Sequence, residues 1–241
     1  KAVGDGILIV PMLSWYVAGF DLDPDVEDES FVPVEIGMMD FHHCRWPSGL
    51  SALDGSLAAH FDELNWDLPD TEGFKTVISF SHFLPRPELV PEKRYLFYPP
   101  LAKAVGSRTL GERVCKLRPH CHVFGHTHYG WNVEIEGIRY LQAAVAYPHE
   151  RDSRGFALKL CEEDGEKPGA SLTGGVVKPM LVYDGVRCTF PRYRGFWSEY
   201  YAKHPRRPSD VRWMYRKPRD KRATGLALRE LVNRGDVVED E

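Results

Sequence analysis

Two short apolar runs that each lead to a histidine constrain the fold of this chain more than any other feature of its sequence. The first, residues 76–80, is rich in β-branched side chains and is followed by His82. The second, residues 121–124, is followed by His126 and His128. Both runs are predicted strands. Because ligands gather at the carboxyl ends of parallel strands, we expect the three imidazoles to share one site.

The segment between the two runs predicts how these strands are connected. Pro85 and Pro87 end regular structure after the first run, and residues 101–117 can form a helix that leads into the second. This order favours a right-handed crossover and a mostly parallel sheet, so the fold class is α/β. Other predicted elements are a strand at 7–16, a helix at 50–66, a hairpin within 131–146 that turns at Glu136 and Gly137, short strands at 156–160 and 180–183, a loop at 162–175 and a final helix at 226–233.

The three histidines suit a metal site. Imidazole nitrogen is a common ligand of zinc, iron and manganese, and the glycine before His126 lets the backbone turn sharply. We therefore predict His82, His126 and His128 as metal ligands. Without carboxylates they could hold one ion weakly, but they could not hold two ions at close spacing. Whether this chain binds metal stays open. His120 and His122 lie inside the second strand and are predicted to be packed or hydrogen-bonded.

Two motifs carry a family resemblance. Ser-His-x-x-Pro at 81–85, followed by Val-Phe-Gly-His-Thr-His at 123–128, resembles the last two motifs of the calcineurin-like metallophosphoesterases. Further likeness to plant-type and protist members lies in segments 13–16, 40–47 and 137–142. The resemblance covers roughly residues 7 to 150.

The resemblance implies specific roles for the histidines. His82 and His126 would bind one metal ion and His128 the other, and a hydroxide between the ions would attack phosphorus. The complete domain would bind two divalent ions, Mn, Fe or Zn, whereas this chain would hold one or none. The implied fold is a metallophosphoesterase-like β-sandwich of two mixed sheets flanked by helices.

Other motifs of that family are missing. Its first three motifs are Asp-x-His, Gly-Asp-x-x-Asp and Gly-Asn-His, and the sequence contains neither of the last two. Residues 40–42 spell Asp-Phe-His, but they lie outside the expected context, so we interpret them as an ordinary loop. We therefore expect only the C-terminal half of the domain. Its exposed strand edges would be covered by a partner or by further residues of the same polypeptide.

Charge divides the chain into an acidic body and a basic tail. Residues 178–234 carry a net charge of +10 and residues 1–177 a net charge of −10, within a total of −4. We predict a phosphoesterase part at 1–186 and a tail at 187–241. The tail mixes arginine with aromatic side chains, as protein interfaces and grooves for single-stranded nucleic acid do. The tail could pack back on the body, residues 187–222 could dock a protein partner, or, with the least support, the tail could contact nucleic acid.

An acidic loop in the first thirty residues has two interpretations. Aspartates alternate at 21, 23 and 25, as in calcium-binding loops. However, Val26 and Val32 stand where such a loop needs glycine and glutamate, and Pro24 interrupts it. We therefore predict a solvated surface loop.

The composition excludes some classes of protein. The five cysteines are an odd number, widely spaced and without a Cys-x-x-Cys pair, so we expect reduced thiols in an intracellular compartment, either cytosol or organelle interior. No apolar run approaches the roughly 20 residues that span a bilayer, so we expect no membrane span.

The predicted function follows from the site and the resemblance. We expect a metal-dependent phosphoesterase that acts on a phosphate ester, although this chain alone is predicted to be inactive because the earlier metal-ligand motifs are absent. Arg86 and Arg151 could bind substrate oxygens, and Tyr129 could form an aromatic wall. The alternative is a catalytically inactive phosphoesterase-like accessory subunit that docks into a larger assembly through its basic tail.

Overall fold

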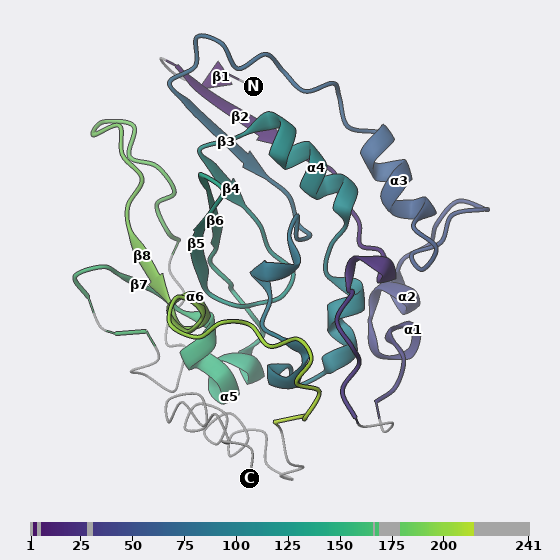
Figure 1. Ribbon diagram of the computed structural model, residues 1–241. Coiled ribbons are helices and arrows are strands. Elements are labelled where there is room, and N and C mark those ends of the chain that lie inside the picture. Colours follow the sequence, from purple (N-terminus) through teal and green to yellow (C-terminus); the bar gives the residue numbers. More distant parts are fainter. Residues whose placement is uncertain (1, 4–5, 28–30, 166, 169–178, 215–241) are drawn as a thin grey trace. The chain divides into compact units, whose positions relative to one another are not determined.

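The computed structural model describes residues 2–3, 6–27, 31–165, 167–168 and 179–214 (Figure 1). The chain forms two compact units. The first comprises Lys1–Thr127, Val133–Leu141 and Pro208–Arg212, and the second comprises His128–Asn132, Gln142–Arg207 and Trp213–Glu241. The predicted boundary between residues 186 and 187 stays a prediction.

A six-stranded sheet, most of whose residues belong to the first unit, is the main structural element (Figure 1). Its strands stand in the order β1, β2, β3, β4, β6, β5. Their bounds are Ala2–Val3 for β1, Ile7–Pro11 for β2, Thr76–Phe80 for β3, Cys121–Val123 for β4, Trp131–Ile135 for β5 and Ile138–Gln142 for β6. Strand β1 pairs antiparallel with β2, whereas β2, β3, β4 and β6 pair in parallel. The predicted α/β class with a mostly parallel sheet is confirmed.

The two faces of β2 and β3 differ in burial. Val10 and Ser79 are register partners, and both are buried, as is Val77. On the other face Ile78 is half-buried and Phe80 is exposed. Because side chains alternate along a strand, the buried set faces one side of the sheet.

The hairpin of β5 and β6 follows the prediction. Its turn is formed by Glu136 with φ 54° and Gly137 with φ 77°. Two consecutive left-handed residues give the type I′ turn, whose twist matches that of the strands. Glycine adopts this conformation without steric cost, which is why the turn could be predicted from the sequence.

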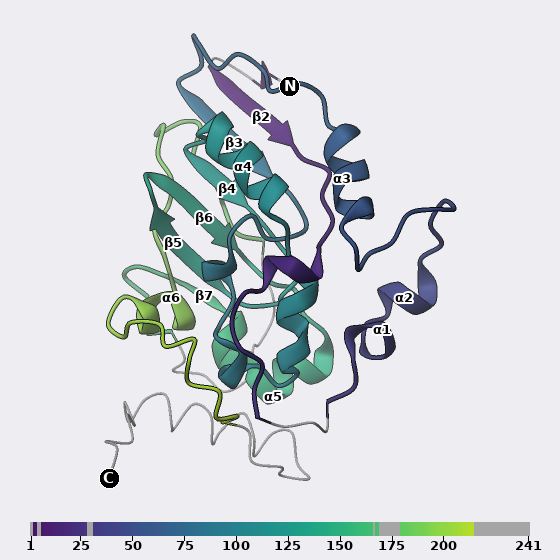
Figure 2. The same ribbon diagram turned by 45° about the vertical axis from the view of Figure 1, so that its right-hand side comes forward.

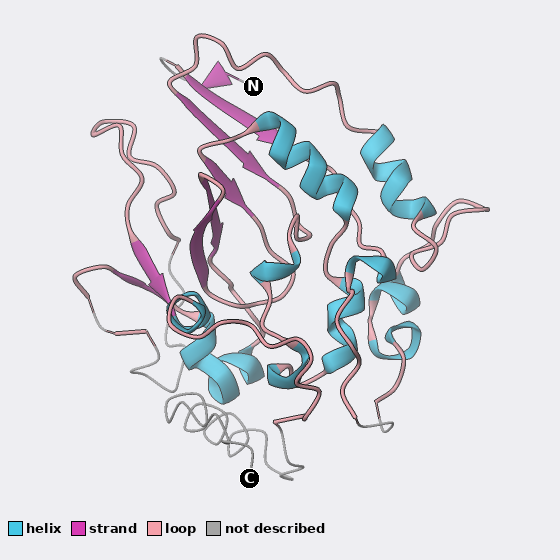
Figure 3. Ribbon diagram, viewed as in Figure 1, coloured by secondary structure: helices cyan, strands magenta, loops and turns pink. Residues whose placement is uncertain are grey.

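Helices and loops connect the parallel strands (Figures 2 and 3). The connection from β2 to β3 contains the 3₁₀ helix η1, Ala18–Phe20, and the helices α1, Val34–Gly37, α2, Asp40–His43, and α3, Ser56–Glu63. The connection from β3 to β4 contains the 3₁₀ helices η2, Pro87–Leu89, η3, Lys93–Tyr95, and η4, Pro99–Ala104, and the helix α4, Arg108–Leu117. Helices α3 and α4 pack together, and the guanidinium of Arg113 donates to Asp62 at 2.8 Å. Among the helices of the described residues, none combines the length and apolar character of a membrane span.

The predicted helix at 101–117 is divided in two. Leu84 donates its N–H to the carbonyl oxygen of Val105 at 2.8 Å, and the backbone passes so close that a Cβ at Gly106 would lie 2.0 Å from the carbonyl oxygen of Leu84. Only glycine fits there. Ser107 is the N-cap of α4, because its hydroxyl accepts a hydrogen bond from the backbone N–H of Leu110 at 3.4 Å.

Several predicted elements require correction. The predicted strand at 156–160 is wrong, because α5 spans Pro148–Leu158 and the next strand begins at Leu160. The predicted strand at 180–183 is also wrong, since the nearest pairing is a single bridge between Asp184 and Thr189. The helix at 50–66 and the strand at 7–16 are shorter than predicted. The predicted helix at 226–233, and most of the loop at 162–175, lie outside the described residues.

The second unit has a small sheet and an aromatic core. Strand β7, Leu160–Glu162, pairs antiparallel with β8, Tyr193–Gly195, which leads directly into α6, Phe196–Tyr201. Phe196 and Trp197 are buried, and Phe156 of α5 contacts Phe196 at 4.8 Å between ring centroids. Arg206 stacks on the ring of Tyr201 at 4.2 Å. The aromatic residues at the start of the predicted tail therefore pack within this unit.

The acidic loop folds around a lysine rather than remaining fully solvated. The ammonium of Lys93 lies 2.6 Å from Oδ2 of Asp21, 2.9 Å from Oδ1 of Asp25 and 2.5 Å from the carbonyl oxygen of Asp23. Lys103 also pairs with Asp25, at 2.6 Å. Burial raises the pKa of Asp21 from its ordinary value, although the hydrogen bond and the charge of Lys93 oppose this shift. The ammonium of Lys93 thus supplies the positive charge that balances the carboxylates of Asp21 and Asp25.

A second ion pair fastens residues 208–212 within the first unit. The guanidinium of Arg94 donates to the carboxylate of Asp210, and both side chains are about nine-tenths buried. Asp210 also accepts from Arg212 at 2.8 Å. In addition, the backbone N–H of Glu27 donates to the carbonyl oxygen of Val211 at 3.2 Å. Residues 208–212 of the predicted tail therefore pack within the first unit, where Asp210 is paired with Arg94 and Arg212.

Candidate functional site

Two of the predicted histidines meet beyond the carboxyl ends of β3 and β4. Nε2 of His82 lies 3.3 Å from Nδ1 of His126. Backbone hydrogen bonds hold the two strand ends together: Ser81 donates its N–H to Val123, and Gly125 donates to His82, each at 3.0 Å. The structure therefore brings these imidazoles together, as expected from the strand pattern. Their role as metal ligands stays a prediction.

The backbone at His126 is strained. Its φ of 71° lies in the left-handed region, which residues other than glycine adopt at a cost of about 1–3 kcal/mol. His128 has a similar φ of 55°. Glycine would occupy either position at less cost, so histidine at both positions indicates a use for the imidazole.

A backbone carbonyl fixes the proton of His126. Nε2 of His126 lies 2.7 Å from the carbonyl oxygen of Ala104, and this oxygen can only accept a hydrogen bond. Nε2 therefore carries the proton, and in the neutral ring Nδ1 presents its lone pair towards His82. Such a bond from the outer nitrogen to a carbonyl is typical of histidines that ligate metals, because it fixes the tautomer and orients the ring.

Aromatic rings pack on one side of the His82 and His126 pair. The ring of Tyr16 stacks on His126 at 6.2 Å between centroids, and Phe83 lies 4.6 Å from His126. Trp15 in turn contacts Phe83 at 5.0 Å. These rings exclude water from one side of the site, which strengthens electrostatic interactions there.

Asp40 has a connection to this site that its sequence context did not predict. Burial, and then the charge of Asp40, raise the pKa of Tyr16 well above its ordinary value, so the phenol stays neutral. Tyr16 is the ring that stacks on His126. His42, by contrast, bonds through Nε2 to the carbonyl oxygen of Ile36 at 3.0 Å. Asp40 begins the short helix α2, so the predicted loop at 40–42 is corrected to a helix.

The donor set fits one metal ion in part. In a tetrahedral zinc site with bonds of 2.0–2.1 Å, two ligand nitrogens stand about 3.3–3.4 Å apart, close to the observed separation. The same separation also suits a hydrogen bond from Nε2–H of His82 to Nδ1 of His126. Within the part of the chain that the structure describes, no group of three or more His, Cys, Asp and Glu side chains is placed to hold an ion. These residues therefore offer two ligands rather than a complete coordination shell.

The third predicted ligand, His128, belongs to the second unit and has a carboxylate partner there. Its Nδ1 lies 2.8 Å from Oε2 of Glu150, whose carboxylate also pairs with Arg154. Burial raises the pKa of Glu150, but the bond to His128, the charge of Arg154 and the backbone N–H of Tyr147 outweigh burial and lower it to about 2. A carboxylate on Nδ1 makes Nε2 of His128 the nitrogen with a lone pair for an ion.

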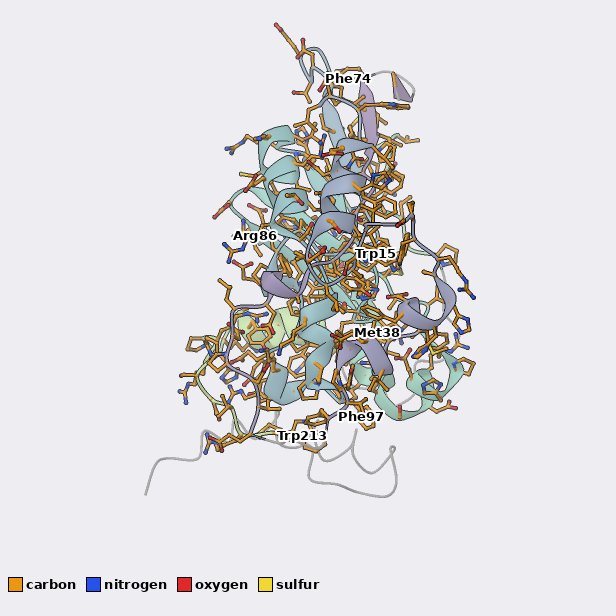
Figure 4. All side chains as sticks on the ribbon, turned by 90° about the vertical axis from the view of Figure 1, so that its right-hand side faces the viewer. Trp15, Met38, Phe74, Arg86, Phe97 and Trp213 are labelled. Atoms are coloured by element: carbon orange, nitrogen blue, oxygen red, sulfur yellow. The ribbon has the colours of Figure 1, made fainter. Side chains whose placement is uncertain are left out.

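The predicted substrate residues have other partners. Arg86 donates to Glu136 at 2.8 Å and to Glu88 at 3.1 Å. Figure 4 shows Arg86 apart from Trp15, the tryptophan of the aromatic cluster around His126. Arg151 donates to the carbonyl oxygen of Val145 at 3.2 Å. Their roles in substrate binding stay predictions.

Tyr129, the predicted aromatic wall, is buried in the second unit. The guanidinium of Arg154 stacks over the ring of Tyr129 at 4.9 Å. The backbone carbonyl oxygen of Tyr129 accepts a hydrogen bond from Nε2 of Gln142 at 2.5 Å. Its role in substrate binding also stays a prediction.

Sequence reasoning missed three partners of the histidines. The carbonyl of Ala104 carries no sequence signal, because a carbonyl is common to all residues. Tyr16 lies in segment 13–16 of the family resemblance, but an aromatic ring is ordinary in a core, so nothing marked it as a partner of His126. Glu150 could have been found. It stands two residues after Pro148, and a proline closely followed by a glutamate marks the start of a helix in a sequence. In the structure its carboxylate accepts the N–H of Tyr147 at 2.9 Å.

Comparison with known proteins finds one distant structural likeness and no sequence match. No family model matches the sequence, and no curated protein matches it. Among solved structures, the chain is similar to the crystal structure of the phosphopantetheinyl hydrolase from Mycobacterium tuberculosis, with a TM-score of 0.37 and 19% identity. The match covers 59% of this chain and 50% of that chain, so this chain spans about half the length of the structure it matches. A likeness at this level does not assign a family.

Proposed function

We propose that this chain is a metal-binding part of a phosphoesterase-type hydrolase, in which His82 and His126 hold one divalent ion. The observation that carries the proposal is the position of the two rings. Two imidazole nitrogens stand 3.3 Å apart at the carboxyl ends of parallel strands, and the second nitrogen of His126 bonds to the carbonyl of Ala104. The resemblance of segments 81–85 and 123–128 to two metallophosphoesterase motifs supports the same assignment.

The residues of this chain would bind and orient the ion. Two neutral imidazoles leave the charge of a divalent ion uncompensated, which preserves its strength as a Lewis acid. Such an ion would polarise a phosphate ester and lower the pKa of a bound water. The bond to Ala104 holds the ring of His126 in the tautomer that ligation needs. Tyr16 and Phe83 keep water from one side of that ring.

Two imidazoles do not make a hydrolytic centre by themselves. A catalytic zinc site commonly has three protein ligands, and a phosphoesterase with two ions needs bridging oxygen ligands as well. We propose that the further ligands come from outside the described residues or from another polypeptide. Full activity would then require those additional ligands.

A catalytically inactive accessory subunit is the second candidate. The observation that favours it is the absence of Gly-Asp-x-x-Asp and Gly-Asn-His from all 241 residues. In that case the histidine pair would be a structural remnant, and the 3.3 Å contact a hydrogen bond between two rings.

Metal titration of the purified chain tests the proposal. We expect Zn²⁺ or Co²⁺ to bind to wild type in calorimetry, and Co²⁺ to give the visible absorption of a nitrogen-ligated ion. His126→Ala should abolish this binding. His43→Ala is the matched control, because His43 is an exposed histidine of α2, and it should bind as wild type does.

Two results would overturn the proposal. One is the absence of binding by wild type, and the other is equal binding by wild type and His126→Ala. Because full activity would require additional ligands, hydrolysis by this chain alone does not separate the two candidates. Metal affinity does, since an accessory subunit would bind Zn²⁺ weakly and equally in wild type and His126→Ala.

A further inference from the structure

A fully buried histidine lies directly behind the candidate metal site. His122 of β4 and Ser79 of β3 are register partners, and both have no exposed surface. Nδ1 of His122 lies 2.8 Å from the hydroxyl of Ser79, and Nε2 lies 3.0 Å from the hydroxyl of Ser81. The hydroxyl of Ser81 also lies 2.7 Å from the carbonyl oxygen of Phe83. This chain of hydrogen bonds links β3, β4 and the residues around His82.

The direction of each hydrogen bond in this chain is determined. The carbonyl oxygen of Phe83 can only accept, so the single hydroxyl proton of Ser81 points to it. Ser81 must therefore accept from His122, which puts the ring proton on Nε2. A neutral imidazole has one N–H, so Nδ1 is an acceptor and Ser79 donates to it.

Burial keeps this arrangement in one protonation state. It lowers the pKa of His122 from 6.5 to about 3, because a charged imidazolium would lack solvation there. The ring therefore stays neutral at ordinary pH. All of its polar atoms are bonded, as a buried polar group requires.

The far end of the network encloses His82. Ser81 precedes His82 and Phe83 follows it, so the bond from the Ser81 hydroxyl to the Phe83 carbonyl closes a small ring of backbone around His82. The carbonyl oxygen of His82 accepts from the N–H of Gly125, one residue before His126. The position of the His82 imidazole thus depends on a backbone segment that His122 holds through Ser81.

We propose that His122 is a positioning residue, which acts through Ser81 to hold His82 at the place where its ring meets His126. The assignment rests on the proposed function of the histidine pair. It concerns orientation only, since His122 is enclosed and does not itself bind an ion. Because an apolar side chain would fill the same space without demanding two partners, the polar network at this strand end has a use beyond packing.

A matched pair of serine variants tests this role. Ser81→Ala and Ser79→Ala each remove one hydrogen-bond partner of the His122 imidazole. Only the Ser81 hydroxyl also bonds to Phe83, so substitutions of His122 are needed as well to separate its role from that of Ser81 alone. We expect Ser81→Ala to weaken binding of Zn²⁺ by about tenfold or more, as loss of outer-shell partners does, and Ser79→Ala to change it by less than about threefold. Thermal stability should fall in both.

A second readout does not depend on metal. In ¹⁵N–¹H spectra of the imidazoles, wild type should show His122 protonated on Nε2 at all pH values at which the protein is folded. Ser81→Ala should shift the ring resonances of His82, whereas Ser79→Ala should leave them in place. If wild type binds no Zn²⁺, the proposed function fails, and these ring resonances alone decide the positioning role.

Substitutions of His122 itself provide an independent check, should Ser81→Ala fail to fold. The amide of His122→Gln can reach Ser81, whereas that of His122→Asn reaches only Ser79. We expect His122→Gln to keep more Zn²⁺ affinity and a His82 resonance closer to wild type. The proposal is overturned if Ser81→Ala and Ser79→Ala have equal effects on His82, or if His122→Asn retains the wild-type His82 signal better than His122→Gln does.

Discussion

The backbone N–H of Gly125 donates to the carbonyl oxygen of His82 at 3.0 Å, so the turn before His126 lies directly against the other histidine of the pair. A Cβ at Gly125 would stand 3.3 Å from Nδ1 of His82 and 3.4 Å from its carbonyl oxygen. Both distances are tight, and the His82 ring would have to shift by a few tenths of an ångström. The glycine therefore sets how closely the two imidazoles approach each other.

Gly125→Ala should weaken metal binding without unfolding the protein. We expect Zn²⁺ affinity to fall by about tenfold, because the His82 ring would be displaced from the position that it shares with His126. Gly19→Ala is the matched control, since a Cβ there meets nothing within 4 Å. Calorimetric titration of both variants measures the difference, and equal affinities would contradict the role of Gly125.

Gly106→Ala should be strongly destabilising. The added Cβ would stand 2.0 Å from the carbonyl oxygen of Leu84, a backbone atom that cannot move away without breaking the pairing of residues 84 and 105. We expect a loss of about 3 kcal/mol or more in the free energy of unfolding, as for other severe backbone clashes. Urea denaturation measures it. Comparable stability of Gly106→Ala and Gly19→Ala would show that the chain accommodates the clash.

Lys93→Met should destabilise the protein by about 3–5 kcal/mol, because it leaves the buried carboxylate of Asp21 without a counter-charge. The raised pKa of Asp21 fixes the direction of the pH dependence. A carboxyl whose pKa is higher in the folded state favours folding at low pH and loses that contribution as pH rises through the folded pKa. The destabilisation by Lys93→Met should therefore shrink on acidification.

The control for this prediction is Lys103→Met. Lys103 pairs with the exposed Asp25, so its loss should cost about 1 kcal/mol or less at any pH. Denaturation of both variants at neutral and at acidic pH provides the measurement. A Lys93→Met deficit that grows with acidification would contradict the prediction.

Asp210→Asn should remove a contribution to the free energy of unfolding that wild type loses at acidic pH. The hydrogen bond from Arg212, and then the charge of Arg94, lower the pKa of Asp210 from 3.8 to about 2. A carboxyl with a lowered pKa stabilises the fold above its unfolded pKa, and this contribution is lost as pH falls through the folded value. After allowance for solvent screening, about 1 kcal/mol should disappear from wild type between about pH 4 and pH 2.

Asp210→Asn should lack that step, and acid denaturation of both proteins tests this. Asp67→Asn is a suitable control, because Asp67 is exposed. An unchanged acid transition in Asp210→Asn would mean that residues 208–212 contribute little to the first unit.

Local patterns were sufficient to predict the elements that position the candidate site. The β-branched run at 76–80 forms a strand with the predicted bounds, and the hairpin turn at Glu136 and Gly137 needed no knowledge of distant residues. The order of strand, helix and strand then placed His82 and His126 at the same edge of the sheet. Each of these inferences depends on neighbours in sequence.

The predictions that failed depended on distant partners or on competing local signals. Residues 156–160 alternate like a strand, but α5, which begins at Pro148 and is kinked at Arg154, extends to Leu158 and buries Phe156. The bond between His126 and Ala104 joins backbone to side chain across a long connection. No local pattern could have predicted that Lys93 would enter the loop of Asp21 and Asp25.

The cation of the acidic loop is covalently part of the chain. A loop that binds Ca²⁺ loses its order when the ion is chelated or diluted, whereas the ammonium of Lys93 stays beside Asp21 and Asp25 at any concentration of EDTA. Treatment of this protein with a chelator should therefore leave that loop unaffected. Any response to EDTA in stability or spectrum would then have to come from another part of the molecule.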